Sequence, residues 1–283
     1  MYNKKFILLL MITLFALISF SIGVSAVDVA VTIVPQKQFV KAVAEDKSEV
    51  TVMIPPGYSP GNYAPRPSEL TKLSDAKIYF SMGVPADLQN ILPKVKQFNP
   101  EIEVVKLAEL VGKKFENRTF PNGSRDPHIW LSPKRVIYMV NIISDELSKQ
   151  DPANDEFYQK NAEEYIKNIR KTNQRVKEII DKKENKYMLV YHPSFGYFAE
   201  EYGLEIVSIE EGGKEATAKH LQEIIDFAKE NNIKKIFYQA EIDSRQTEAI
   251  AEETKAELVK LDPLAEDYLA NLIEMAKKIS GVE

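Results

Sequence analysis

Residues 151–183 read DPANDEFYQKNAEEYIKNIRKTNQRVKEIIDKK, and beyond Pro152 this run contains neither glycine nor proline. Its apolar residues recur at helical spacing and fall roughly on one face of a helix: Phe157, Tyr165, Ile166, Ile169, Val176, Ile179 and Ile180. Some thirty helical residues extend over about 45 Å. A glycine- and serine-rich linker would let the flanking regions hinge freely, and this run has the opposite composition. We therefore predict one long, rigid helix over residues 151–184 that joins two lobes.

Both flanking regions alternate short apolar strands with longer amphipathic segments, which is typical of parallel sheets covered by helices. We predict an α/β fold with two Rossmann-like lobes, residues 27–150 and 185–283, each built on a parallel four-stranded sheet. The predicted strands are 31–34, 50–54, 77–80 and 103–105, then 186–190, 205–208, 234–238 and 257–260. The predicted helices are 36–45, 86–96 and 133–150, then 195–202, 217–231, 244–254 and 265–279.

The N-terminus has the three parts of a secretory signal peptide. MYNKK is basic, FILLLMITLFALISFSIGV is apolar, and VSA ends in small residues. We predict a signal peptide over residues 1–26 with cleavage after Ala26. The alternative is a retained membrane anchor, because about 19 mostly apolar residues nearly span a bilayer. Either way the protein is secreted across the cytoplasmic membrane and works in the periplasm or at the cell surface.

Composition excludes several classes of protein and of site. The chain has no cysteine, which excludes a disulfide scaffold and any cysteine-ligated metal site. A formal charge of −5 argues against nucleic-acid binding, which needs a basic face. With 3 histidines in 283 residues, a site built on imidazole must use His128, His192 or His220. We interpret His220, inside a predicted exposed helix, as a surface residue.

Polar residues follow three strands of the second lobe at the strand ends, where open α/β sheets bind ligands. His192 follows KYMLV, Glu241 comes shortly after KKIFY, and Asp262 follows ELVK. In the first lobe, His128 lies in the loop DPHIWLSP. If the lobes face each other, His128 and His192 meet, and two imidazoles with one or two carboxylates suit zinc, manganese or iron(II). The simpler alternative is that each is a surface or capping residue.

Seven segments, in this order, resemble the metal-binding solute-binding proteins of zinc and manganese ABC importers. They are VTIVPQKQFVKAV, MIPPGYSPGNYAPRPSEL, LSDAKIYFSMGVPAD, DPHIWLSP, YHPSFGYFAEEYGLEIVSIEEGGKEATAKHL, IFYQAEIDSRQTEAIAEET and KLDPLAEDYLANL. The resemblance covers nearly all of the chain after residue 26. It implies two α/β lobes, a rigid connecting helix and one metal ion, zinc or manganese, in the cleft. It also implies delivery of that ion to a membrane permease with a cytoplasmic ATPase.

By position, the resemblance makes His128 the second metal ligand, His192 the third and Asp262 the fourth. The chain departs from the family at the first ligand, where Pro60-Gly61-Asn62-Tyr63 stands in place of Pro-His-x-Tyr. The family's histidine-rich loop is also missing, since residues 112–125 contain no histidine. Tyr58, Asn62 or Glu241 would have to substitute for the first ligand, and we expect Glu241, because it follows a strand that points at the cleft.

We therefore expect a metal-binding transport protein, monomeric and without enzymatic activity. Two alternatives remain: a secreted zinc-dependent hydrolase with Glu241 as its general base, or a surface adhesin that has lost metal binding. The acid-rich segment 210–215 is interpreted as a solvated turn on the second lobe.

Overall fold

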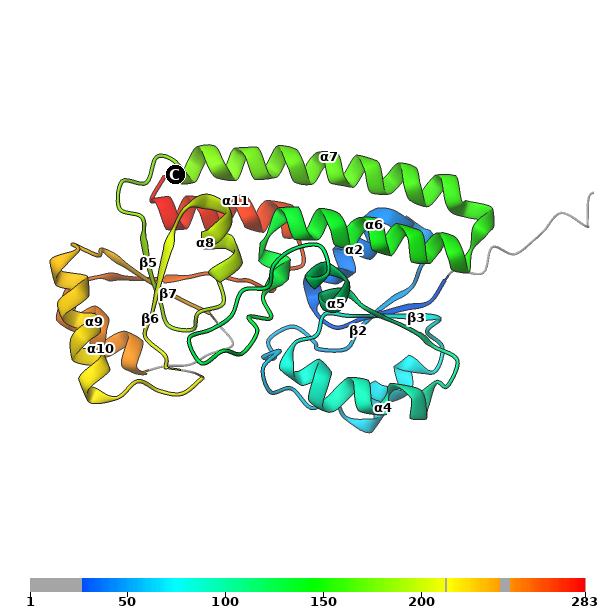
Figure 1. The fold of residues 1–283 in the computed structure, drawn as a ribbon, viewed down its shortest axis with the longest axis horizontal. Coiled ribbons are helices and arrows are strands. Elements are labelled where there is room, and N and C mark those ends of the chain that lie inside the picture. Colours follow the sequence, from blue (N-terminus) through cyan, green and yellow to red (C-terminus); the bar gives the residue numbers. More distant parts are fainter. Residues whose placement is uncertain (1–26, 212, 240–244, 283) are drawn as a thin grey trace, which may run out of the picture.

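The computed structural model describes residues 27–211, 213–239 and 245–282. The predicted signal peptide, residues 1–26, and Glu241 lie outside this range. Within it, none of the helices combines the length and apolar composition needed to cross a membrane. Figure 1 shows two α/β lobes side by side beneath one long helix.

The first lobe is built on a parallel sheet of strand order β2-β1-β3-β4. Its strands are β1 (Val29–Val31), β2 (Val50–Val52), β3 (Ile78–Ser81) and β4 (Glu103–Lys106). The helices of this lobe are α2 (Val34–Ala44), α3 (Pro67–Leu70), α4 (Leu92–Phe98), α5 (Leu107–Gly112) and α6 (Pro133–Gln150). A π-helical turn, Asp87–Ile91, precedes α4. A 3₁₀ turn, Ile129–Leu131, precedes α6.

The second lobe repeats this arrangement with strand order β6-β5-β7-β8, again all parallel. Its strands are β5 (Tyr187–Val190), β6 (Glu205–Ser208), β7 (Lys235–Tyr238) and β8 (Glu257–Lys260). Its helices are α8 (Gly196–Tyr202), α9 (Ala218–Glu230), α10 (Arg245–Thr254) and α11 (Tyr268–Ser280). The prediction of two parallel four-stranded sheets is confirmed.

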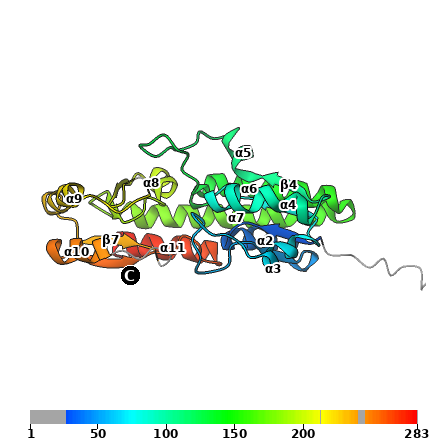
Figure 2. The same ribbon diagram turned by 90° about the horizontal axis from the view of Figure 1, so that it is seen from below.

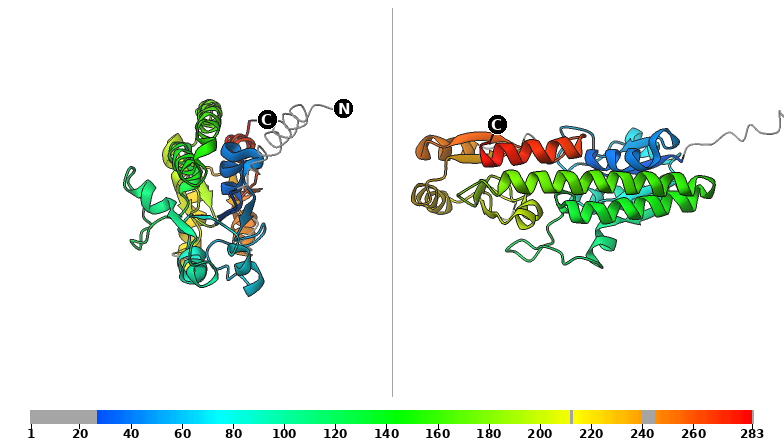
Figure 3. Two further views of the ribbon diagram at one scale, coloured as in Figure 1. Left: turned by 90° about the vertical axis from the view of Figure 1, so that its right-hand side faces the viewer. Right: turned by 90° about the horizontal axis from the view of Figure 1, so that it is seen from above.

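The long helix α7 (Asp155–Ile180) has 26 residues and lies within the predicted connecting segment 151–184. It packs against α2 and α6 of the first lobe and against α11 of the second (Figures 1 and 3). One hydrophobic core runs through Phe80 of the first lobe, Ile169 of α7 and Leu272 of the second lobe. Because this core continues across both lobes, the helix is a rigid connection, as predicted.

The prediction of a strand over residues 31–34 is wrong in its position. The strand is Val29–Val31, and Val34 already belongs to α2. The side-chain oxygen of Gln36 accepts hydrogen bonds of 3.0 Å from the backbone N–H groups of both Thr32 and Ile33. These bonds tie the two residues before α2 to its first turn and end the strand early.

The last helix also starts later than the predicted residue 265. It begins at Tyr268, because the side chain of Asp267 caps it by accepting a hydrogen bond of 3.1 Å from the backbone N–H of Ala270.

Candidate metal centre

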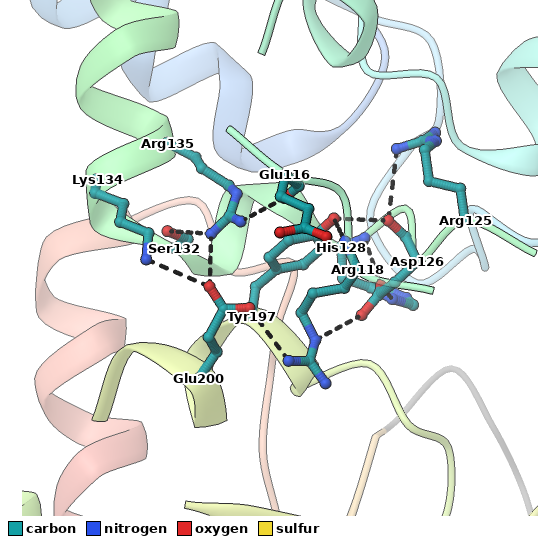
Figure 4. A network of polar contacts seen from close by, with 10 residues as sticks. All are labelled: Glu116, Arg118, Arg125, Asp126, His128, Ser132, Lys134, Arg135, Tyr197 and Glu200. Atoms are coloured by element: carbon teal, nitrogen blue, oxygen red, sulfur yellow. Dashed lines mark hydrogen bonds and ion pairs between the residues drawn. The ribbon is translucent and has the colours of Figure 1, made fainter. Parts of the chain in front are cut away.

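The segment between α5 and α6, residues 113–132, carries His128 and stands out from the body of the first lobe toward α8 (Figure 2). The carboxylate of Asp126 fixes the histidine from within this segment. One Asp126 oxygen accepts the backbone N–H of His128 at 2.9 Å and lies 2.7 Å from Nδ1 of its ring. Asp126 is buried, so this carboxylate holds the imidazole in one orientation (Figure 4).

His192 is held in the same way from the second lobe. It follows β5 by two residues, and its Nδ1 lies 2.9 Å from a carboxylate oxygen of Glu210, which follows β6 by two residues. Val190 at the end of β5 pairs with Ser208 at the end of β6, so the residues two positions beyond each strand end lie side by side. Glu210 is buried, which corrects the interpretation of segment 210–215 as a wholly solvated turn.

The two imidazoles meet between the lobes. Their ring centres are 5.4 Å apart and the ring planes are inclined by 74°. An imidazole bound to zinc through nitrogen has its centre about 3.2 Å from the ion, so two such rings at a tetrahedral angle have centres about 5 Å apart. The observed separation therefore matches that of two ligands on one ion.

Hydrogen bonding leaves the same nitrogen available on each ring. In both histidines Nδ1 faces a carboxylate, which favours the tautomer with the proton on Nδ1 and the lone pair on Nε2. This carboxylate–histidine arrangement is the one that usually supports a metal-ligating imidazole. Burial lowers the pKa of His128, and the hydrogen bond from its ring to Asp126 offsets part of that effect. A lowered pKa keeps the ring neutral near pH 7, as metal binding requires.

The structure does not group Asp262 with the histidine pair. This residue is exposed, lines a cavity of about 60 Å³ with Tyr58 and Pro55, and accepts a hydrogen bond of 2.9 Å from the backbone N–H of Leu264. In the part of the chain that the structure describes, no cluster of three or more histidine, aspartate or glutamate side chains could hold a metal. Glu241, the other predicted carboxylate ligand, lies outside that part.

The loop that carries Gly61 is anchored at its ends and exposed at its tip. The Pro60 carbonyl accepts a hydrogen bond of 2.9 Å from Ala86, and the Tyr63 hydroxyl donates one of 2.6 Å to Glu69. Gly61 is exposed, and a Cβ built on it would meet one atom within 4 Å, the hydroxyl oxygen of Ser59 at 3.3 Å. The loop backbone therefore leaves room for a side chain at this position.

A larger cavity of about 490 Å³ adjoins His192. Phe120, Ser124, Glu210 and His220 are among the residues that line it. His220 is half-buried, and its Nε2 lies 3.3 Å from the backbone carbonyl of Ser208. We interpreted His220 as a surface residue. The structure shows it half-buried, at the wall of this cavity.

Comparison with known proteins assigns the chain to a family. Residues 29–282 match the family model described as zinc-uptake complex component A, periplasmic. The high-affinity zinc uptake system protein ZnuA of Bacillus subtilis is 30% identical over 248 residues, which are 83% of this chain and 78% of that protein. The manganese-binding lipoprotein MntA of Halalkalibacterium halodurans is 26% identical, over 71% of this chain and 66% of the relative.

A longer relative and a solved structure agree with this placement. The zinc-binding lipoprotein AdcA of Streptococcus pneumoniae strain R6 is 27% identical over 84% of this chain, and the matched region is 50% of AdcA. The crystal structure of a ZnuA superposes with a TM-score of 0.86 at 34% identity and covers 90% of this chain and 98% of that one. The chain belongs to the family of periplasmic zinc-uptake component A proteins.

Proposed function

We propose that this protein captures a divalent transition metal ion, zinc or manganese, in the cleft between its two lobes and delivers it to an ABC permease. His128 and His192 are the proposed central ligands, and Asp262 and Glu241 are the proposed carboxylate ligands. The choice of zinc or manganese rests on the names of the relatives, because ZnuA and AdcA are zinc proteins and MntA is a manganese protein.

One observation supports the histidine pair above all others. Two imidazoles from different lobes lie 5.4 Å apart, and each has its Nδ1 on a buried carboxylate. Burying two carboxylates beside two imidazoles costs desolvation energy that a purely structural contact would not need. A bound cation offsets that cost, because it adds positive charge next to the rings that the carboxylates support.

Asp262 and Glu241 are proposed to complete the coordination, directly or through water. The turn that carries Asp262 is tied to the histidine segment, since Trp130 Nε1 donates a hydrogen bond of 2.8 Å to the Pro263 carbonyl. Carboxylate oxygens beside two nitrogens suit manganese as well as zinc, whereas a three-histidine site would favour zinc. We therefore leave both metals in the proposal.

The proposed role is metal transport rather than catalysis. The relatives named above are a zinc uptake system protein, a zinc-binding lipoprotein and a manganese-binding lipoprotein. The continuous core through α7 implies that the lobes move little when the ion binds. The proposed partner is a membrane permease with its cytoplasmic ATPase. We propose that the protein is a monomer and binds the permease on the outer side of the cytoplasmic membrane.

Calorimetric titration of the metal-stripped protein with Zn²⁺ and Mn²⁺ tests this proposal. We expect one ion per chain, submicromolar affinity, and a loss of at least about 100-fold in affinity in both His128→Ala and His192→Ala. His220→Ala is the matched control, because it removes the third imidazole, 28 residues after His192, and should leave affinity within twofold. Absence of submicromolar binding of either ion by the unaltered protein would refute the proposal.

A further inference from the structure

The segment that carries His128 belongs to the first lobe in sequence but is docked on α8 of the second lobe. The hydroxyl of Tyr197, on α8, accepts the backbone N–H of Arg118 at 2.9 Å and donates to the backbone carbonyl of Asp126 at 3.4 Å. Tyr197 is buried, so no water replaces these bonds at low cost. One phenol therefore joins both ends of the segment between residues 118 and 126 (Figure 4).

Ion pairs close the same interface around Glu200, one turn further along α8. Arg118 Nη1 lies 3.2 Å from one carboxylate oxygen of Glu200, and Lys134 and Arg135 lie 3.3 and 3.4 Å from the other. The Arg135 guanidinium also stacks over the ring of Tyr197, with 4.4 Å to the ring centre. Three cations of the first lobe thus converge on one helix of the second.

The first residue of α8 is Gly196, and it leaves no room for a side chain. A Cβ at this position would lie 2.7 Å from Oδ2 of Asp126 and 2.9 Å from Nε of Arg118. The Asp126 carboxylate therefore rests against the backbone of α8 with one oxygen while the other oxygen holds His128.

Both proposed histidine ligands are thereby fixed to the same element. His192 lies in the turn that leads into α8, four residues before Gly196. His128 reaches α8 through Asp126 and Tyr197. The distance between the two imidazoles is accordingly set by one turn of the second lobe rather than by the relative placement of two whole lobes.

We propose that Tyr197 and Gly196 are positioning residues for metal binding: they hold Asp126, and through it the ring of His128, at the distance from His192 that one ion requires. This inference rests on the proposed metal site. It assigns the affinity of the site partly to a helix that contributes no ligand, and it makes the lobe interface at α8 part of the metal site.

Tyr197→Phe tests the inference, because it removes the hydroxyl and keeps the ring. Its matched control is Tyr202→Phe on the same helix, where another buried phenol donates a hydrogen bond of 2.6 Å to Asn173, away from His128. Substitution of outer partners of metal-ligating histidines typically costs 10- to 100-fold in affinity, and Tyr197 acts one bond further out. We expect Tyr197→Phe to bind Zn²⁺ about tenfold more weakly in competition with a chromophoric chelator, and Tyr202→Phe to stay within twofold.

Gly196→Ala should weaken binding more than Tyr197→Phe, since it displaces the Asp126 carboxylate itself. Thermal unfolding is measured for all variants to check that each is folded. The visible spectrum of the Co²⁺ form adds a readout of ligand geometry, and we expect its bands to change in Tyr197→Phe and to remain in Tyr202→Phe.

A measurement without metal separates this inference from the proposed function. In ¹⁵N-labelled protein, the ring nitrogens of His128 report its tautomer. We expect the Nδ1–H form alone in the unaltered protein and in Tyr202→Phe, and a mixture of tautomers in Tyr197→Phe. If the unaltered protein binds neither Zn²⁺ nor Mn²⁺, the proposed function fails, while the tautomer spectrum still decides the positioning. If Tyr197→Phe matches Tyr202→Phe in tautomer and affinity, the positioning role is refuted.

Discussion

Trp130 and Pro263 join the two lobes beside His128, one of the proposed metal ligands. The indole Nε1 of Trp130 donates a hydrogen bond of 2.8 Å to the Pro263 carbonyl, 133 residues away in the sequence. Trp130 also packs against His128, with ring centres 5.2 Å apart, and Pro263 follows Asp262 directly. The bond thus connects the surroundings of one proposed ligand to the backbone beside another.

Trp130→Phe removes this bond and should lower both stability and metal affinity. The Pro263 carbonyl loses its partner and the smaller ring leaves a cavity, so we expect the free energy of unfolding to fall by about 2–4 kcal/mol. Affinity for Zn²⁺ should fall by roughly tenfold, because the turn of Asp262 is released. Urea unfolding followed by circular dichroism measures the first effect, since the variant lacks the chain's 1 tryptophan as a fluorescent probe. Unchanged stability would contradict the role assigned to the bond.

Glu210→Gln should weaken metal binding through His192 without removing a ligand. The amide keeps an oxygen near Nδ1 but loses the negative charge that makes the imidazole a stronger donor. We expect affinity for Zn²⁺ to fall about 10- to 100-fold. The neighbouring Glu211 is exposed, so Glu211→Gln is the control and should change affinity less than twofold. Equal effects of the two substitutions would mean that only long-range charge matters.

The fold was largely predictable from the sequence, because hydrophobic alternation and strand length are local properties. The run without glycine or proline after Pro152 indicated the rigid helix, and the resemblance indicated the pairing of His128 with His192. The end of β1 was not predictable, since it depends on the Gln36 side chain reaching back to the backbone of Thr32 and Ile33.

The partners of the two histidines were missed for different reasons. Asp126 stands two residues before His128, and an aspartate that accepts the N–H two residues on is a common turn that could have been inferred. Glu210 lies in the charged run 210–215, where composition indicates solvent. Its place beside His192 follows from the register of β5 with β6, which pairs Val190 with Ser208 and is a property of the folded sheet.

Glu69 makes the stability of the loop of residues 55–70 depend on pH in the acid range. The pKa of Glu69 is lowered, first by the hydrogen bond from the Tyr63 hydroxyl and next by the backbone N–H of Arg66. A carboxylate whose pKa is lower in the folded state stabilises the protein above its ordinary value near 4.5, and that contribution is lost as pH falls through the folded pKa. Glu69→Gln should therefore lower the melting temperature at pH 7, and the difference from the unaltered protein should shrink below pH 4. Melting curves between pH 3 and 7 measure this, and a difference that grows in acid would reverse the sign we expect.

Gly61→His should raise affinity for zinc, because it places an imidazole where the resemblance expects the first ligand. The site is accessible to a side chain: Gly61 is exposed, and the nearest obstacle to a Cβ is the Ser59 hydroxyl, which can rotate away. A third nitrogen ligand beside His128 and His192 favours zinc over manganese, so we expect at least about a tenfold gain for Zn²⁺ and a smaller change for Mn²⁺. Ser68→His adds an imidazole at an exposed position in α3 of the same lobe and controls for adventitious binding. If both variants bind Zn²⁺ equally, residue 61 does not face the ion, and a ligand from elsewhere in the chain completes the site.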